Sequence, residues 1–334
     1  MATRSAVSIV KGDEIEKAVT KAIDLLGGME TIVGKGNMVV LKPNITAALP
    51  PETGVATDPK ILEVLAVLSK EAGARDVVIA EGSGSNDLTD MKGLAEVAQR
   101  TGARLFDINK TPSSEIVNAR IPNPLVLKEI PLPRLLLNAD VIINVPKMKT
   151  TAMRVSLGLK NLMGATPGKG EYAEWSYVPE KGMVPRHPFI PSGGKKIIHS
   201  IKTEKGFRDG LIKAVVDLNK VVHCDLTVID GIYAMEGMGP IHGAPVKMDV
   251  IIAGKDIVSV EAVGAAVMGF NPAKIEMIML AAENGLGVGD LSEIEIRGQA
   301  IEDVYRGFES PDTDARAYYK VPSEEFLAKL PSRR

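Results

Sequence analysis

The chain has 334 residues, of which 45% are hydrophobic and 25% are charged, and its formal net charge at pH 7 is −2. This length suits one large α/β domain or two smaller ones, and the composition argues against wholesale disorder. The slightly acidic balance and the 4% of aromatic residues disfavour a nucleic-acid-binding protein, which usually presents a basic surface or stacking aromatic side chains.

The sequence contains one cysteine, Cys224. A single thiol forms no internal disulfide and holds no iron–sulfur cluster, so we expect a small buried side chain. The first residues contain no apolar stretch of signal-peptide length, and no run approaches the about 18 apolar residues of a membrane-spanning helix. The expected location is the cytoplasm, without membrane contact.

In chain order, β-branched apolar runs alternate with amphipathic patterns, which is typical of βαβ units. The first part of the chain predicts strand 7–10, helix 13–26, strand 38–41, helix 59–72, strand 77–80, helix 94–101, strand 104–108, a hairpin or insertion over 111–137 and strand 140–145. The later part predicts helix 210–222, strands 226–229 and 248–252, helices 258–268 and 273–284 and strand 294–297.

The predicted fold class is α/β, with a mostly parallel sheet flanked by helices, either as one sheet or as two lobes with the site between them. The lobes would cover 1–150 and 208–300, separated by a loop-rich lid and site segment over 151–207 and followed by a tail over 301–334. Within the middle segment, residues 164–206 are poor in apolar runs, which is typical of lids, binding loops or disorder.

Polar, glycine-rich sequences follow four of the predicted strands. Ligands of open α/β sheets bind at the carboxyl ends of the strands, so we expect these sequences to form one convergent site. They are Lys42-Pro43-Asn44, Glu81-Gly82-Ser83-Gly84, Asn144-Val145-Pro146-Lys147-Met148-Lys149-Thr150, and Asp230-Gly231 followed by Glu236-Gly237-Met238-Gly239-Pro240.

The expected ligand of this site is a small anion that carries a phosphate or a carboxylate, or a nucleotide-like cofactor. Glycines let backbone N–H groups approach a ligand, lysines supply charge, and residues 156–161 open a helix whose free N–H groups would favour an anion. The alternative is that the lysines are solvated surface charges. The predicted ligand-binding residues are Lys42, Asn44, Gly82, Ser83, Asn144, Lys147, Lys149, Ser156, Gly158, Lys160, Asn161, Gly237 and Gly239.

Three carboxylates, Glu81, Asp230 and Glu236, are the candidate catalytic acids or bases, because burial at a strand end would raise a carboxyl pKa. Their alternative role is structural, and for Asp58, before Pro59, we expect a helix cap. Glycine-rich stretches elsewhere lack the spacing of nucleotide fingerprints.

The four histidines show no metal-ligand spacing on one helix face. His199 and His242, in or near the predicted site loops, are therefore weak metal candidates, and we favour hydrogen-bonding roles for both. The sequence identifies no cofactor.

Taken together, these motifs resemble the family catalogued as domain of unknown function 362, over about residues 36–298. Relatives often carry an appended ferredoxin-like module with cysteine clusters, which implies redox chemistry and a redox protein partner; this chain has no such clusters. It also has Thr151 where relatives usually have histidine, and Ser259 and Glu261 where alanine and aspartate are typical. The shared motifs are Lys42-Pro43-Asn44, Thr57-Asp58-Pro59, Glu71-Ala72-Gly73-Ala74, Asn144 to Thr150, Leu157 to Gly164, Asp230-Gly231 and Glu236 to Pro240.

The order of elements also looks like that of lactate racemase and its relatives. In those proteins a lysine-bearing loop helps hold a nucleotide-derived, nickel-bearing cofactor, and the likeness makes Lys160 the counterpart, reached through Ser156 and Gly158. The histidines and arginines of a racemase are not clearly matched.

Three functions follow from these patterns. The favoured one is an enzyme that acts on or with an anionic molecule, with its reaction class left open. The alternatives are a non-catalytic cofactor-binding, redox-partner or assembly protein, and a metal-dependent isomerase related to lactate racemase.

Overall fold

The computed structural model describes residues 5–82, 88, 93–151, 153–167, 176–178, 182–184 and 204–311. For 176–178, 182–184 and 204–208 it describes the backbone. Ser83 and His199, two of the predicted site residues, lie outside the described residues.

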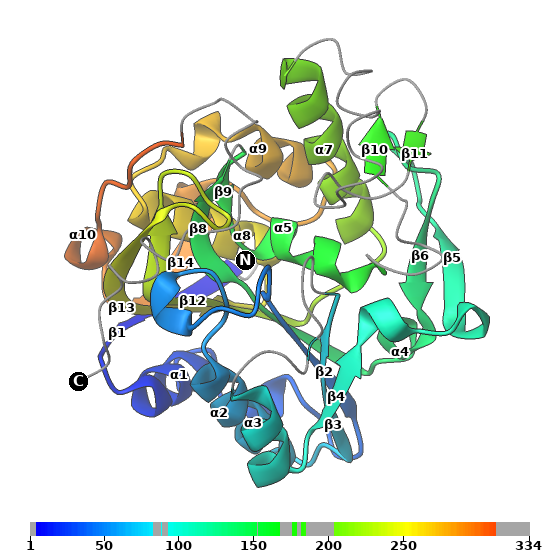
Figure 1. Cartoon of the computed structure of the whole chain (residues 1–334). Helices are drawn as coiled ribbons and strands as arrows, with labels where there is room; N and C mark the ends of the chain where they lie inside the picture. The colour runs from blue at the N-terminus through cyan, green and yellow to red at the C-terminus, as the bar shows by residue number, and fades with distance from the viewer. Residues whose placement is uncertain are drawn as a thin grey trace.

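A large sheet forms the centre of the described part of the chain (Figure 1). Its strands follow the order β14-β1-β13-β12-β7-β2-β3-β4, and β8 pairs with both β12 and β9. Segments 1–150 and 208–300 both contribute strands to this one sheet, and the proposed lobe boundaries stay a prediction. The strands are β1 Ser5–Lys11, β2 Met38–Pro43, β3 Asp76–Glu81, β4 Arg104–Asp107, β7 Val141–Val145, β8 Lys147–Thr151, β9 Arg154–Ser156, β12 Leu226–Glu236, β13 Ala244–Gly254 and β14 Ile294–Gly298.

Most strand pairs in this sheet are parallel, including β7 with β2 and with β12. The long strands β12 and β13 instead form an antiparallel pair, and β13 also runs antiparallel to β1. The predicted fold class, α/β with a mostly parallel sheet, is therefore confirmed.

Helices cover both faces of the sheet (Figure 1). Strand residues alternate between the two faces, so Val39 and Leu41 pack with α1 and α2 whereas Val40 belongs to the core on the side of α7, α8 and α9. One face carries α1 Ile15–Asp24, α2 Pro59–Glu71 and α3 Leu94–Thr101, and the other carries α5 Gly158–Asn161, α7 Glu204–Asn219, α8 Ile257–Val267 and α9 Glu276–Glu283.

The remaining elements are short. They are α4 Arg134–Leu137, α10 Ile301–Val304, β5 Ile116–Arg120, β6 Glu129–Pro133, β10 Ser176–Val178, β11 Gly182–Val184, and the 3-10 turns η1 Met29–Thr31, η2 Pro51–Thr53, η4 Ile108–Lys110, η5 Ser113–Glu115, η6 Leu162–Ala165, η8 Pro272–Lys274 and η9 Leu291–Glu293.

The predicted hairpin over 111–137 is confirmed as the antiparallel pair β5–β6. Its tip is held by Asp217 of α7, whose carboxylate accepts backbone N–H bonds from Leu125 at 2.8 Å, Val126 at 2.7 Å and Leu127 at 2.9 Å. A buried carboxylate with several backbone donors is well compensated, so this contact fastens the insertion to α7.

The start of α2 follows its sequence signal. Asp58 Oδ1 accepts a hydrogen bond from the Lys60 N–H at 2.9 Å, and Pro59 occupies the first helical position. The expected cap is therefore confirmed, and it fixes the end of the loop that follows β2.

Two further features concern membrane-spanning helices and the cysteine thiol. Across the described ranges, no helix is both long enough and apolar enough to cross a membrane. Cys224 is half-buried, and burial raises the pKa of its thiol to about 12, so it stays protonated at neutral pH.

Candidate functional site

Two lysines enter the site from β8, a strand where the sequence predicted a loop. The chain becomes extended again immediately after Pro146. Lys147 and Lys149 are two residues apart in β8, so they project from the same face of the strand, while Met148 enters the core on the other face. The parallel neighbour β12 places Asp230 opposite Lys147 and Met235 opposite Lys149.

Lys42 and Glu81 form the first buried ion pair of the site, at the carboxyl ends of β2 and β3. The Lys42 Nζ lies 2.8 Å from Glu81 Oε2, and the two side chains are 1% and 3% exposed. Glu81 Oε2 also accepts the Ile45 N–H at 3.1 Å. Burial raises the pKa of Glu81, and the charge of Lys42 opposes that shift.

Lys147 and Asp230 form the second buried pair, with 2.9 Å between Nζ and Oδ2. The same oxygen accepts the Asp58 N–H at 2.8 Å, and Asp230 Oδ1 accepts the Ile232 N–H at 3.1 Å. Asp230 therefore joins β8, β12 and the start of α2. Burial raises the pKa of Asp58, and the nearby charge of Asp230 raises it further.

Lys149 is as buried as Lys147 but has different partners. Its Nζ donates to Val55 O at 2.7 Å and to Thr46 Oγ1 at 3.2 Å. Across the described ranges, no carboxylate forms an ion pair with it, which distinguishes it from Lys42 and Lys147.

The surroundings of Lys149 shift its protonation. Burial lowers the pKa of its amine well below 10.5, and the charges of Lys147 and Lys160 lower it further. The charges of Glu81 and Asp230 act in the opposite direction. These four groups are thus close enough to Lys149 to interact with it electrostatically.

Three asparagines connect the strands around the lysines. Asn161 Nδ2 donates to Asn144 Oδ1 at 2.8 Å, and Asn44 Nδ2 donates to Asn161 Oδ1 at 3.0 Å. Asn144 Nδ2 donates in turn to Gly158 O at 2.9 Å. The amides therefore hold β2, β7 and α5 in register, while Asn44 Oδ1 is buried without a hydrogen-bond partner.

The backbone N–H groups predicted to bind an anion already contact an acid of the same chain. Glu261 on α8 is fully buried, and its Oε2 accepts the Leu159 N–H at 2.9 Å. Burial raises the pKa of Glu261 to about 8, while hydrogen bonds from the N–H groups of Leu159, Leu157 and Gly158 lower it. Its Oε1 has no hydrogen-bond partner.

Glu261 departs from the family pattern in the sequence but was not among the predicted site residues. A single acid in an otherwise apolar helix, Ile257–Val267, was the available signal. Lys160, half-buried on α5, and Ser156, the partner of Lys149 in the β8–β9 pair, lie on either side of the N–H groups that Glu261 contacts.

Glycines let the backbone close over the first ion pair. The Gly82 N–H donates to Gly164 O at 3.0 Å. A Cβ on Gly164 would overlap Glu81 Oε1 and would lie 2.6 Å from Lys42 Nζ. A side chain at Gly164 would therefore displace the Lys42–Glu81 pair.

The predicted residues at and after the end of β12 form a second polar network. Glu236 Oε1 accepts from Arg306 Nη2 at 3.0 Å, and its Oε2 accepts the Glu309 N–H at 3.1 Å, so this carboxylate fastens residues 306–309. Gly237 O accepts from Thr150 Oγ1 at 2.9 Å. Gly239 packs against the carbonyl of Thr150 so closely that a Cβ would overlap it.

His242 follows these residues in the chain and is half-buried. Its Nε2 is buried and has no hydrogen-bond partner among the described residues. Burial lowers its pKa, which favours the neutral imidazole. In the portion of the chain that the structure describes, no three His, Cys, Asp or Glu side chains gather as a metal site would require.

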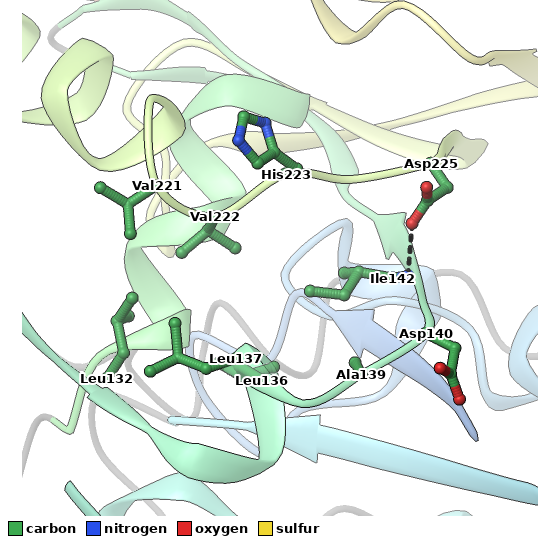
Figure 2. Close-up of a pocket in the computed structure, with 10 residues that line it drawn as sticks. All are labelled: Leu132, Leu136, Leu137, Ala139, Asp140, Ile142, Val221, Val222, His223 and Asp225. Atoms are coloured by element: carbon green, nitrogen blue, oxygen red, sulfur yellow. Dashed lines mark hydrogen bonds between the residues drawn. The ribbon is translucent and has the colours of Figure 1, made fainter. Parts of the chain in front are cut away.

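A cavity of about 210 Å³ lies at the opposite edge of the sheet (Figure 2). It is lined at the amino end of β7 by Asp140 and Ile142, and before β12 by His223 and Asp225. Asp225 Oδ2 accepts the Ile142 N–H at 2.8 Å, the bond drawn in Figure 2. Because the buried lysines that were predicted to bind an anion lie at the other end of the strands, we propose the functional site there and not in this cavity.

Comparison with known proteins identifies the family. The family described as a domain of unknown function, DUF362, matches residues 39–266. The chain belongs to this family. The match contains Lys42, Glu81, both β8 lysines and Glu261, so the buried site lies within the DUF362 region, and the predicted membership is confirmed.

Two individual proteins are similar to this DUF362 chain. A thylakoid-associated protein of Synechocystis is 27% identical over 278 residues, which cover 80% of this chain and 73% of that protein. The lactate racemase apoprotein of Thermoanaerobacterium thermosaccharolyticum is 15% identical with a TM-score of 0.41; the match covers 78% of this chain but 57% of the racemase. The second likeness is too distant to support any argument about the site.

Proposed function

We propose that this DUF362 protein is an enzyme that binds a small phosphate- or carboxylate-bearing molecule beside a lysine cluster formed by Lys42, Lys147, Lys149 and Lys160. The observation that carries the proposal is Lys149, a buried amine with two lysines as electrostatic neighbours and with oxygen partners that carry no net charge.

Charge balance supports an added anion. Lys42 and Lys147 each have a buried carboxylate within 2.9 Å, whereas Lys149 has a hydroxyl and a carbonyl oxygen. An ammonium group buried without a counter-charge costs roughly several kcal/mol, so burial without a carboxylate partner favours the neutral form of Lys149. An anion bound beside Lys149 would be attracted by the charges of Lys147 and Lys160 together more strongly than by either charge alone.

In the proposed reaction, the buried carboxyl groups transfer the protons. Glu81 is the first candidate, because burial raises the pKa of its carboxyl group and it lies beside Lys42 in the proposed site. Asp230 receives three hydrogen bonds, one of them from Lys147, and is the second candidate. Glu236 remains a proposed acid or base, although its contacts to residues 306–309 favour a structural role.

The test is calorimetric titration of the intact protein with oxalate and with inorganic phosphate. Lys160→Ala should weaken binding of the preferred anion by about tenfold or more, which is about 1.4 kcal/mol, and should leave the thermal unfolding curve nearly unchanged because Lys160 is half-buried.

Lys17 provides the matched control, since its side chain is 77% exposed and its partner is Glu14 on the same surface. Lys17→Ala should leave anion binding unchanged. Equal affinities for the unmodified protein and the Lys160 variant, or no binding of either anion, would contradict the proposed function.

A further inference from the structure

We propose that Lys149 is a covalent catalytic residue that forms a Schiff base with the carbonyl carbon of an anionic aldehyde or 2-oxo acid. The inference rests on the proposed function, because it names the substrate class of the same site.

The hydrogen bonds of Lys149 match those of a neutral amine. A neutral amine has two N–H bonds and one lone pair, and Lys149 Nζ has two acceptors, Val55 O and Thr46 Oγ1. The third N–H of an ammonium group would have no acceptor among the residues that the structure describes. The neutral form therefore satisfies both N–H bonds and leaves its lone pair for an electrophile.

Apolar side chains make up part of the surroundings of the amine. Val55, whose carbonyl accepts from Lys149, packs in one buried cluster with Met235, the β12 residue that lies opposite Lys149. An amine becomes nucleophilic when desolvation and neighbouring cations remove its proton, and Lys147 and Lys160 are those cations here. Lys147 is not the proposed nucleophile, because its Nζ lies 2.9 Å from the carboxylate of Asp230 and forms an ion pair with it.

The segment 46–55, between β2 and α2, covers the amine. A bridge between Ile45 and Ala56 closes its base, and it packs onto β12 at Gly54, where φ is +72° and a Cβ would overlap Ala234 O. Lys149 is 1% exposed, so a substrate would reach Nζ only after segment 46–55 moved away from it. Closure over the bound molecule would then exclude water from the Schiff base.

The reaction is balanced without any further reagent. The lone pair of the Lys149 amine attacks the carbonyl carbon and forms a carbinolamine, which loses water that carries the carbonyl oxygen and both amine hydrogens. The product is an imine, and its C=N bond draws electrons from the adjacent carbon, which activates that carbon for proton removal. The anionic group of the substrate would interact with Lys160, and this requirement selects 2-oxo acids and anionic aldehydes over neutral carbonyl compounds.

Reductive trapping of the intact protein tests the proposal. The protein is incubated at pH 7 with glyoxylate and sodium cyanoborohydride, which reduces an imine to a secondary amine, and peptide mass spectrometry locates the resulting carboxymethyl groups. We expect Lys149 to be modified about tenfold faster than the exposed Lys17, because an exposed lysine is almost wholly protonated at this pH.

Two controls separate the amine from the anion site. Lys160→Met should slow modification of Lys149 by glyoxylate but not by acetaldehyde, which has no anionic group. Oxalate, an anion that forms no imine under these conditions, should protect Lys149 from glyoxylate.

The outcomes separate this inference from the proposed function. If oxalate binds but Lys149 stays unmodified while exposed lysines react, the covalent role is wrong and the anion site stands. If oxalate neither binds nor protects and Lys149 stays unmodified, both proposals fail. Modification of Lys149 that oxalate does not affect would support the reactive amine and contradict the anion site.

Discussion

The two ends of the strands around β7, called here the amino edge and the carboxyl edge of the sheet, use polar residues in different ways. At the amino end, Asp140 and Asp225 are exposed, and each accepts a backbone N–H, from Met38 at 2.7 Å and from Ile142 at 2.8 Å. At the carboxyl end, lysines and carboxylates are almost completely removed from solvent and bond chiefly to one another and to loop backbone.

The difference is one of desolvation. Exposed carboxylates that cap strand ends lose little hydration and contribute modestly, whereas buried charges must recover a large hydration energy from their partners. Well-packed apolar residues would stabilise the carboxyl edge at least as well. The buried lysines there are therefore the physical reason why we propose the functional site at this edge, away from the cavity of Figure 2.

The largest effect should follow from breaking a buried pair at the carboxyl edge. Lys147→Met leaves the Asp230 carboxylate buried without its cation, and we expect a loss of about 3–5 kcal/mol in the free energy of unfolding. Urea denaturation measures it. The double variant Lys147→Met, Asp230→Leu should recover part of the loss, and a loss below about 1 kcal/mol in the single variant would show that the pair is not desolvated.

The second effect is a change in the pH dependence of the free energy of unfolding, caused by Glu261. Its folded pKa of about 8 exceeds the ordinary 4.5, so between these values the folded state holds a proton that the unfolded state has released. The protein therefore loses stability as pH rises through this window, by up to about 1.4 kcal/mol per pH unit. Glu261→Gln should remove this pH-dependent contribution to the free energy of unfolding.

The pH slope of Glu261 must be separated from that of Lys149, which has the opposite sign. The pKa of Lys149 lies below its ordinary 10.5, so stability from this group increases with pH up to that value. The difference between unfolding free energies of the unmodified protein and the Glu261 variant, measured from pH 5 to pH 8, isolates the acid. Parallel curves would show that Glu261 is ionised in the folded protein.

The smallest effect belongs to the amino edge. Asp225→Ala removes the acceptor of the Ile142 N–H, and because Asp225 is exposed, water can replace it; we expect a loss of about 1 kcal/mol. Denaturation under the conditions used for Lys147→Met gives the comparison. A loss as large as that of the Lys147 variant would remove the distinction between the two edges.

Much of this arrangement could be predicted from sequence because strand ends are locally encoded. Apolar β-branched runs and the Asp58-Pro59 signal placed β2, β3, β7 and α2, and parallel strands bring their carboxyl ends to one edge. Lys42 and Lys147 were therefore expected at that edge, and the structure places both there.

The partners of these lysines could not be predicted in the same way. The pairing of Lys42 with Glu81, and of Lys147 with Asp230, depends on strand order and register, which apolar periodicity does not encode. The residues after strand 140–145 were expected to form a site loop, but β8 begins immediately after Pro146 and gives Lys149 its buried position. Contacts between distant segments, such as Glu261 with the N–H of Leu159, leave no local signal beyond an acid in an apolar helix.

The position of a bound oxyanion tests the central claim most directly. A crystal structure of the protein grown with selenate, an oxyanion whose anomalous scattering identifies it, would locate the anion without assuming a substrate. The account predicts an anomalous peak beside Lys160 and Lys149, under segment 46–55, and its loss in the Lys160→Ala variant. Selenate bound only at exposed surface residues, with the lysine cluster empty, would contradict it.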